Sequence, residues 1–247
     1  MTSAGMAEVT PATLREMQAK HPQPANPLPP LPDSEVSSPT FTISEVTKAA
    51  LSFRKGTAAG PSGMRPEHFA VVLKGPPVNL AGKAQGVLTK LVNAMAAGKV
   101  PQAVSPFLCG ARLHAGKKKD GGLRPIAVGN LIRRLVAKCF SSRLSERAAS
   151  LLKPHQLGVG VKAGCEAVAH AVRKAVKDDP SLSVLQVDFI NAYNSVDRGS
   201  IIEATAKYFP ECLEWVKTCY GSASCLKFGD EGIASTNGVH QGDPLAS

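Results

Sequence analysis

The feature that most limits what this chain can fold into is a run of apolar residues that ends in a carboxylate. Residues 184–187 are Val-Leu-Gln-Val, and Asp188 follows them directly. A short, largely apolar run of this kind predicts a buried β-strand. An ionised carboxylate is costly to bury without a partner. We therefore expect Asp188 to face a helix N-terminus, an arginine or a divalent cation.

Other polar residues near this run and near the end of the chain have simpler structural explanations. Asp197 precedes a helical pattern, so we expect it to cap that helix. Asn191 and Asn194 are expected to stabilise the turn that follows the strand. His240 is expected to be an ordinary exposed residue, and Asp243, which precedes a proline, a turn residue.

The positive charge of the chain is concentrated in one region. The 247 residues hold 29 Lys and Arg against 19 Asp and Glu, a net charge of +10. Residues 99–147 contain eleven of the basic residues and only two acids. A local excess of this size predicts a polyanionic partner such as a nucleic acid. Aromatic residues make up only 5% of the chain, which argues against a single-strand binder built mainly on aromatic stacking.

A basic hairpin is predicted inside this region. Two short strands within residues 107–130 flank a turn rich in Lys, Asp and Gly. Lys117, Lys118 and Lys119 crowd that turn, and Arg124 lies on the returning strand. Ammonium and guanidinium groups in this arrangement can hold phosphate oxygens, the guanidinium bidentately.

A basic helix is predicted directly after the hairpin, over residues 131–152. Its first turns separate an apolar set from a basic set that we expect to face a nucleic acid. The basic set is Arg133, Arg134 and Lys138, and the apolar set is Ile132, Leu135, Val136 and Phe140.

The remaining pattern predicts a mixture of helices and short strands. Thr42 and Glu45 have the spacing of a capping box, and Pro66 suits the first turn of a helix. Further predicted elements are a helix over 84–95 with Val87, Leu88, Leu91 and Val92 on one stripe, and a helix with Val168, Val172 and Val176 on one face. Two short helices are expected between the apolar run and a final hairpin over 224–235, whose turn is at 229–232.

The first forty residues have a different composition. They contain eight prolines and few bulky apolar residues, so we expect residues 1–40 to be a disordered linker or tail. Every apolar stretch of the chain is interrupted well before about 18 residues, so no membrane span and no membrane partner are expected. The start of the chain does not have the pattern of a secretory signal, and the six cysteines form no CxxC pair. An intracellular protein with free thiols is expected, in the nucleus or the cytoplasm.

Four strings of this sequence together resemble the reverse transcriptases of non-LTR retrotransposons, over residues 41–247. GPSGMRPEHF is similar to that family's opening segment and KKKDGGLRPIAV to its fingertip hairpin. LQVDFINAYNSVDR is similar to its first carboxylate motif, and GVHQGDPLAS to its Gln-Gly motif. The resemblance implies an α+β fold of the right-hand polymerase type, with helices packed on short antiparallel sheets. It assigns residues 41–183 to a fingers-like region and residues 184–247 to a partial palm.

The resemblance also implies roles for individual residues. Asp188 would be a catalytic carboxylate that binds Mg²⁺ or Mn²⁺, with the Phe189 carbonyl as a second ligand. Lys118 and Arg124 would hold the triphosphate of the incoming dNTP, Tyr193 would exclude a 2′-hydroxyl, and Gln241 would line the nucleotide pocket. The residues expected to contact nucleic acid are Lys117, Lys119, Arg133, Arg134 and Lys138. The expected partners are an RNA template, a DNA primer and dNTPs, with no stable protein partner.

The sequence departs from the family pattern at one point. The family's paired aspartates should follow the Gln-Gly motif, and no Asp-Asp pair occurs after Asp188. We therefore expect a fragment that is truncated before that motif and inactive by itself in two-metal nucleotidyl transfer. The alternatives are a non-catalytic basic module that binds nucleic acid, a retroelement remnant, and another reverse transcriptase lineage such as the group II intron maturases.

Overall fold

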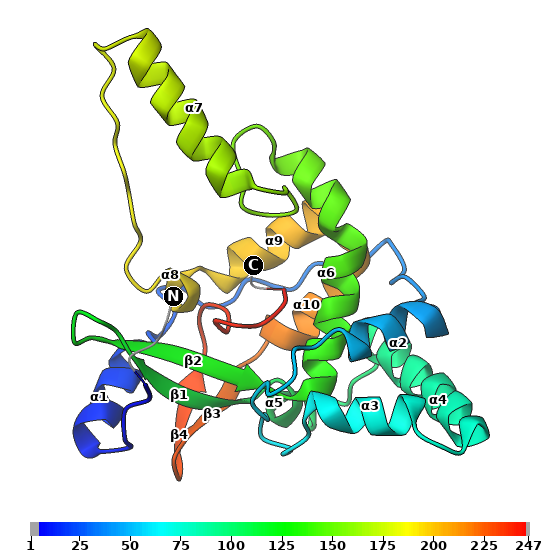
Figure 1. Cartoon of the computed structure of the whole chain (residues 1–247). Helices are drawn as coiled ribbons and strands as arrows, with labels where there is room; N and C mark the ends of the chain where they lie inside the picture. Colours follow the sequence, from blue (N-terminus) through cyan, green and yellow to red (C-terminus); the bar gives the residue numbers. More distant parts are fainter. Residues whose placement is uncertain (1–4, 246–247) are drawn as a thin grey trace.

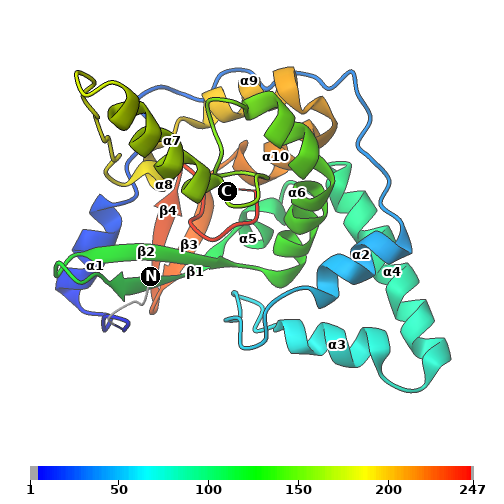
Figure 2. The same cartoon turned by 45° about the horizontal axis from the view of Figure 1, so that its top comes forward.

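The computed structural model describes residues 5–245, which form an α+β fold (Figure 1). One sheet lies at one end of the molecule, and α2, α3 and α4 lie at the other, with α6 and α10 between them (Figure 2). The helices in the described range are α1 (Pro11–Ala19), α2 (Ile43–Leu51), α3 (Pro66–Lys74), α4 (Val78–Ala96), α5 (Ser105–Leu108), α6 (Leu131–Leu152), α7 (Gly164–Asp178), α8 (Ala192–Ser195), α9 (Arg198–Tyr208), the 3-10 helix η1 (Pro210–Cys212) and α10 (Leu213–Tyr220). The strands are β1 (Ala111–Lys117), β2 (Leu123–Gly129), β3 (Ser224–Phe228) and β4 (Glu231–Ser235).

The strands form one mixed sheet with the order β2-β1-β3-β4. β1 pairs antiparallel with β2, and β3 pairs antiparallel with β4, as the two hairpin patterns predict. The second edge of β1 pairs in parallel with β3, where Ala111 lies opposite Leu226 and Arg112 opposite Lys227. The expected α+β class is confirmed, but the expectation of separate antiparallel sheets is wrong. The sheet also crosses the expected boundary at residues 183/184, because β1 and β3 come from its two sides.

Local turn chemistry explains both hairpins. In the first, Gly121 has a φ of +86°, and the Asp120 carboxylate accepts a hydrogen bond from the N–H of Gly122 at 3.1 Å. In the second, Gly229 has a φ of +62°. The second turn is tighter than the pattern predicts, since Gly232 already belongs to β4. Glycine fits the positive φ without steric strain.

The main core packs around Phe41, Phe140 and Trp215. The rings of Phe41 and Phe140 meet edge to face at 5.2 Å, and Trp215 is fully buried. Asn93 of α4 holds the backbone of Phe41 on both sides, donating to its carbonyl at 2.9 Å and accepting from its N–H at 2.8 Å. The capping box of Thr42 and Glu45 and the helix start at Pro66 are confirmed.

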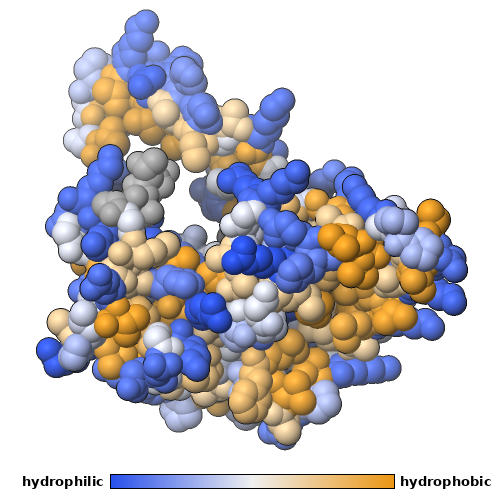
Figure 3. Space-filling view, turned by 60° about the horizontal axis from the view of Figure 1, so that its bottom comes forward, coloured by the Kyte–Doolittle hydropathy of each residue, from blue (hydrophilic) through white to orange (hydrophobic). Residues whose placement is uncertain are grey.

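The stripe predicted for residues 84–95 is only half buried. α4 begins earlier, at Val78, and buries Leu88 and Val92, while Val87 and Leu91 are 67% and 44% exposed. On the face shown in Figure 3, hydrophobic residues gather on the side where Figure 1 places α3 and α4. The exposed apolar residues of these two helices are Val71, Val72, Val78, Leu80, Val87 and Leu91. In the described part of the chain, no helix has the length and apolar character needed to cross a membrane.

Part of the segment that was expected to be disordered, residues 1–40, has regular structure: α1 spans Pro11–Ala19, whereas residues 22–42 contain no helix or strand. Thr10 and Thr13 form a capping box for α1, whose Met17 is fully buried against the sheet. Met6 forms a β-bridge with Gly116 of β1. The prolines disfavour regular structure, but Leu14 and Met17 gain enough contact with the sheet to fix the helix. Residues 1–4 lie outside the described residues.

The strand predicted at residues 184–187 does not form. Residues 182–189 have no regular structure, and Val184, Leu185 and Val187 are 61%, 87% and 64% exposed. α7 projects from the rest of the molecule, and this segment returns from it to α8 (Figure 1). The valine face of α7 is likewise open to solvent. The apolar pattern predicts burial, but burial requires a neighbouring strand, and none pairs with this segment in the described range.

The ion pair between Glu45 and Arg143 predicts a pH-dependent contribution to stability. The hydrogen bond from Arg143, followed by that from the Thr42 N–H, lowers the pKa of Glu45 from 4.5 to about 2. A lowered folded-state pKa stabilises the fold above the unfolded-state value and loses this effect as the pH falls toward 2. The Glu45 side chain is 41% exposed, so solvent screening limits the contribution to about 0.5–1 kcal/mol. In urea unfolding, Glu45→Gln should lower stability at pH 7 and match the wild type near pH 2. A difference that stays constant across this range would contradict the assignment.

Candidate functional site

The basic hairpin forms as the pattern predicts. β1 and β2 place Lys117 opposite Leu123 and Arg124 opposite Gly116. Lys117, Lys118 and Lys119 are exposed at the turn, while Arg124 is half-buried on β2. The N–H of Lys118 donates to the carbonyl of Gly122 at 2.8 Å, which closes the turn and keeps the lysines together. The hairpin therefore presents a dense cluster of positive charge to solvent.

The basic residues of α6 do not all face outward. Arg134 and Lys138 are half-buried, with their charged groups 5.4 and 4.4 Å from the centroid of the Phe53 ring. Lys138 also donates to the carbonyl of Ser52 at 3.0 Å. Burial lowers the pKa of both groups. These two side chains tie α6 to the end of α2 through cation–π contacts.

The expectation that Arg133 contacts nucleic acid is wrong, because its side chain is only 1% exposed. It lies 2.7 Å from the carboxylate of Asp243, donates to Nδ1 of His240 at 2.9 Å and donates to the Tyr220 hydroxyl at 3.3 Å. Burial acts to lower the pKa of Arg133, but the Asp243 carboxylate together with Cys219, Tyr220 and Cys109 outweighs this effect, and the pKa is raised. A guanidinium in this position cannot reach a nucleic acid on the surface.

His240 and Asp243 belong to the same buried cluster. His240 is 3% exposed, so the expectation of an ordinary exposed residue is wrong. Burial, and then the charge of Arg133, hold the pKa of His240 well below its ordinary value, so the ring is neutral and its Nδ1 accepts the hydrogen bond. Asp243 is a turn residue as expected, since it accepts from the N–H of Leu245 at 3.0 Å. Its buried ion pair was not predicted.

Arg198 extends the cluster toward the sheet. Its guanidinium donates to the carbonyl of Gly238 at 2.9 Å, to that of Ser222 at 3.1 Å and to the Ser235 hydroxyl at 3.0 Å. Burial lowers its pKa to about 10. Arg198 thus fixes the segment after β4 to α9.

Gln241 owes its position to this cluster. The N–H of Asp243 donates to the carbonyl of His240 at 3.0 Å, which closes a turn with Gln241 and Gly242 at its centre. Gly242 has a φ of +102°, a conformation that favours glycine. Gln241 is half-buried between the two anchored residues.

Direct backbone contacts bring the Gln241 segment against the segment of Tyr193. The N–H of Val239 donates to the Tyr193 carbonyl at 2.7 Å, and that of Gly238 to the Val196 carbonyl at 3.0 Å. Gly238 has a φ of +65°, and a Cβ there would lie 2.4 Å from the Asn194 backbone. Only glycine permits this approach. Two motifs that are separated by some fifty residues in the sequence therefore meet in the structure, with Tyr193 itself 41% exposed.

The polar residues around Tyr193 have structural partners. Asn191 and Asn194 both donate to the carbonyl of Lys20, at 2.8 and 3.0 Å, so they hold the N-terminal segment as well as their own turn. Asp197 caps α9 as expected, accepting from the N–H of Ser200 at 2.7 Å. No catalytic role is needed to explain these three residues.

Asp188 and Phe189 lie in the exposed segment that leads to α8. Phe189 is 76% exposed, and the Asp188 side chain forms no hydrogen bond or ion pair within the described residues. In residues 5–245 there is no group of three or more His, Cys, Asp or Glu that could hold a metal ion. The described residues therefore do not fit the two-metal site that the resemblance implies.

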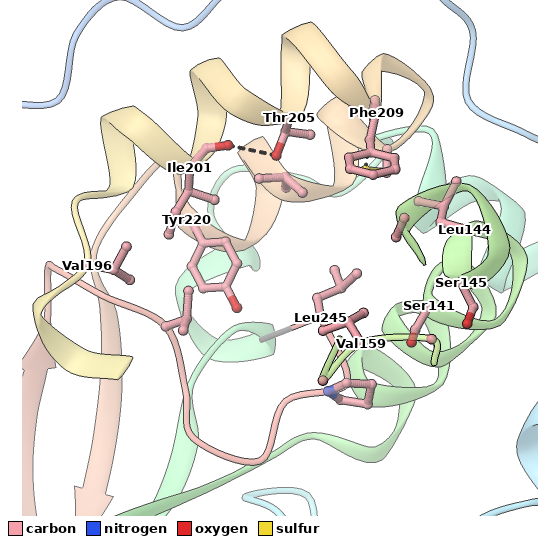
Figure 4. A pocket seen from close by; sticks show the side chains of 17 residues that line it. Ser141, Leu144, Ser145, Val159, Val196, Ile201, Thr205, Phe209, Tyr220 and Leu245 are labelled. Atoms are coloured by element: carbon pink, nitrogen blue, oxygen red, sulfur yellow. Dashed lines mark hydrogen bonds between the residues drawn. The ribbon is translucent and has the colours of Figure 1, made fainter. Parts of the chain in front are cut away.

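The structure contains a cavity of about 560 Å³ that none of the predicted site residues lines (Figure 4). It lies between α6, α9, α10 and the end of the described chain, and its walls are mostly apolar. Tyr220 lines it, as do Leu245 and Val159, while the Thr205 hydroxyl bonds within its own helix to Ile201 at 2.7 Å. This cavity belongs to the packing around the buried cluster.

The buried ion pair predicts that a single variant, which removes one charge, loses more folding stability than a double variant that removes both. Asp243→Asn leaves the Arg133 charge buried without its counterion, which should cost about 3–5 kcal/mol. The double variant Arg133→Met/Asp243→Leu removes both charges and should be more stable than Asp243→Asn in urea unfolding. If Asp243→Asn does not fold, cooperative unfolding of the double variant is the readout. Additive losses in the double variant would contradict the pairing.

Comparison with known proteins supplies the family. A search of curated proteins gives no significant match. The family model described as reverse transcriptase (RNA-dependent DNA polymerase) matches residues 116–247, which is more than half of the chain. The match covers the turn and second strand of the basic hairpin, the Asp188 and Tyr193 segment and the Gln241 turn. The chain belongs to the reverse transcriptase family.

Proposed function

We propose that this chain serves an RNA-directed DNA polymerase by binding the RNA template, the DNA primer and the incoming dNTP. The family match supports the activity class. The observation that carries the assignment to particular residues is the backbone contact between Tyr193 and Val239, because it joins the segment after Asp188 to the Gln241 turn. A nucleotide pocket built from these two segments requires that contact.

The basic hairpin is proposed as the triphosphate-binding element. Lys118 is exposed at the turn and Arg124 lies on the returning strand, so both charges can meet a phosphate group that approaches the hairpin. Charge-assisted hydrogen bonds to phosphate are among the strongest in proteins, and arginine can make two in parallel. Lys117 and Lys119 add charge for the nucleic-acid backbone. Arg133 is not part of the proposal because it is buried.

Asp188 is proposed as the catalytic carboxylate because it precedes Tyr193 by five residues in the motif string. Reverse transcriptases typically use divalent metal ions. The described residues give Asp188 no second carboxylate, so no catalytic step through Mg²⁺ or Mn²⁺ follows from them. The string NAYNSVDR and the order of the four motifs favour a non-LTR element over the group II intron maturases.

The second candidate is a non-catalytic nucleic-acid-binding module. It is favoured by the exposed lysine cluster of the hairpin and by the lack, in the described residues, of an acidic cluster that would include Asp188. Primer extension on an RNA template separates the two. Incorporation that Asp188→Ala abolishes establishes catalysis, whereas heteroduplex binding without incorporation favours the module.

Replacing the hairpin lysines should weaken nucleic-acid binding. The Lys117→Gln/Lys118→Gln/Lys119→Gln variant should have a lower affinity for an RNA–DNA heteroduplex. The slope of log K against log salt should fall by about 1 for each phosphate that is no longer neutralised. Fluorescence anisotropy at several salt concentrations measures both.

A control variant loses the same number of positive charges on α3 and α4, away from the hairpin. Lys74, Lys83 and Lys90 are exposed on α3 and α4, and their replacement by glutamine should leave the affinity and slope nearly unchanged. Equal losses of affinity in the two triple variants would show that only net charge matters and would contradict the hairpin assignment.

A further inference from the structure

A hollow of about 500 Å³ lies along the edge of β1 that faces away from β2. β3 pairs with β1 at Ala111 and Arg112, and the N-terminal segment pairs with it near Gly116. The two partners separate between these points. The floor of the hollow is residues 112–115 of β1, one wall is Met6, Ala7 and Val9, the other wall is residues 227–230, and Pro61 lies at its edge.

Two cations stand next to each other in this hollow. Arg112 and Lys227 are direct partners in the parallel β1–β3 pair, so their side chains project from the same face of the sheet. Like charges in this position destabilise a sheet unless an anion lies between them. Within the described residues, neither side chain forms an ion pair or a hydrogen bond. Asp230 also lines the hollow without pairing with either.

His114 adds a titratable group to the same face. It lies two residues after Arg112 on β1, so the two side chains share a side of the strand. Burial, and then the charge of Arg112, lower the pKa of His114. An anion bound beside Arg112 would favour the protonated ring, which would then donate to it.

The walls of the hollow are apolar where the floor is basic. Met6 and Val9 are 53% and 52% exposed although both line the hollow. Together with Pro61, they offer a surface for the flat, weakly polar face of a nucleobase. The volume falls within the range of about 300–1,000 Å³ typical of small-molecule sites.

We propose that this hollow binds one nucleotide unit of a nucleic-acid strand, with a backbone phosphate on Arg112, Lys227 and His114. The inference rests on the proposed function, since it names a second contact between the chain and its nucleic acid. It differs from the hairpin site, because the contacts come from the opposite edge of β1 and from the N-terminal segment. The negative phosphate of one nucleotide complements the basic floor of the hollow, and its base complements the apolar wall.

The test compares two double variants for binding of a fluorescein-labelled 12-nucleotide RNA. Arg112→Gln/Lys227→Gln removes the paired cations, and Lys83→Gln/Lys90→Gln removes the same charge from α4. All four side chains are exposed, so folding should be retained and is checked by thermal unfolding. The first variant should bind about tenfold more weakly at 0.1 M salt, with a salt slope reduced by about 1. The second should bind like the wild type.

The outcomes separate this inference from the proposed function. Wild-type binding that Arg112→Gln/Lys227→Gln leaves unchanged overturns the hollow and leaves the hairpin assignment standing. Failure of the wild-type chain to bind RNA overturns the proposed function itself. Competition by free AMP or inorganic phosphate at micromolar concentration assigns the hollow to a small anion and overturns the strand proposal.

A pH series supplies a second readout. The charged groups that line the hollow with His114 are Arg112 on its own strand, Lys227 and Asp230, and the strand register also places Arg124 of β2 on the same face of the sheet. RNA affinity should rise several-fold between pH 7.5 and 5.5 as His114 becomes protonated on binding. The rise should be absent in His114→Asn and retained in Asp230→Asn. If the RNA affinity of His114→Asn still rises at low pH, the imidazole does not contribute to the site.

Discussion

The pairing of Arg133 with Asp243 is the interaction on which the rest of the candidate site depends. It joins the middle of the molecule, α6, to the segment that follows β4, and it does so in a region closed to solvent. His240 and Tyr220 each accept a further hydrogen bond from the terminal nitrogens of the guanidinium, which helps to offset the cost of burying its charge. Removing water from two charges is costly, so an arrangement that separates them would leave an uncompensated buried charge.

The consequence of this anchor is the position of the Gln241 turn. Arg198 holds the preceding residues to α9 and the sheet, and Gly238 allows the backbone to approach Asn194 closely. The Tyr193 segment is therefore attached to the Gln241 turn by main-chain hydrogen bonds and needs no side-chain contact. β1 plays the corresponding role on the sheet, since it pairs with β2, β3 and the N-terminal segment and so connects the basic hairpin to the later part of the chain.

Local patterns in the sequence predicted the elements whose stability is local. The two hairpins, the Thr42 capping box and the Asp197 cap depend on residues within a few positions of each other, and all are confirmed. The N-terminal helix was missed because proline content outweighed Leu14 and Met17, whose contacts lie more than ninety residues away in the sheet. The prediction of a strand at 184–187 was wrong because a distant contact is missing. An apolar run becomes a buried strand only where a partner strand is present.

The buried cluster was the largest omission at the site. Arg133 was placed with the basic face of α6, although Ile132, Leu135 and Val136 surround it in sequence, and that setting is a signal for a buried arginine. A buried arginine requires hydrogen-bond acceptors, often a carboxylate, and Asp243 close to His240 could have been considered as that partner. The roles of Lys118, Arg124, Tyr193 and Gln241 remain predictions from the motifs, and the backbone contacts supply a physical reason to group the last two.

Photoaffinity labelling with an azido-substituted dNTP tests the central claim most directly, namely that the hairpin, the Tyr193 segment and the Gln241 turn serve one nucleotide. The account predicts saturable labelling, prevented by excess unlabelled dNTP, with the modified peptides mapping to residues 117–124 and to 188–193 or 239–243. Labelling that does not saturate, or that maps only to other parts of the chain, would contradict it.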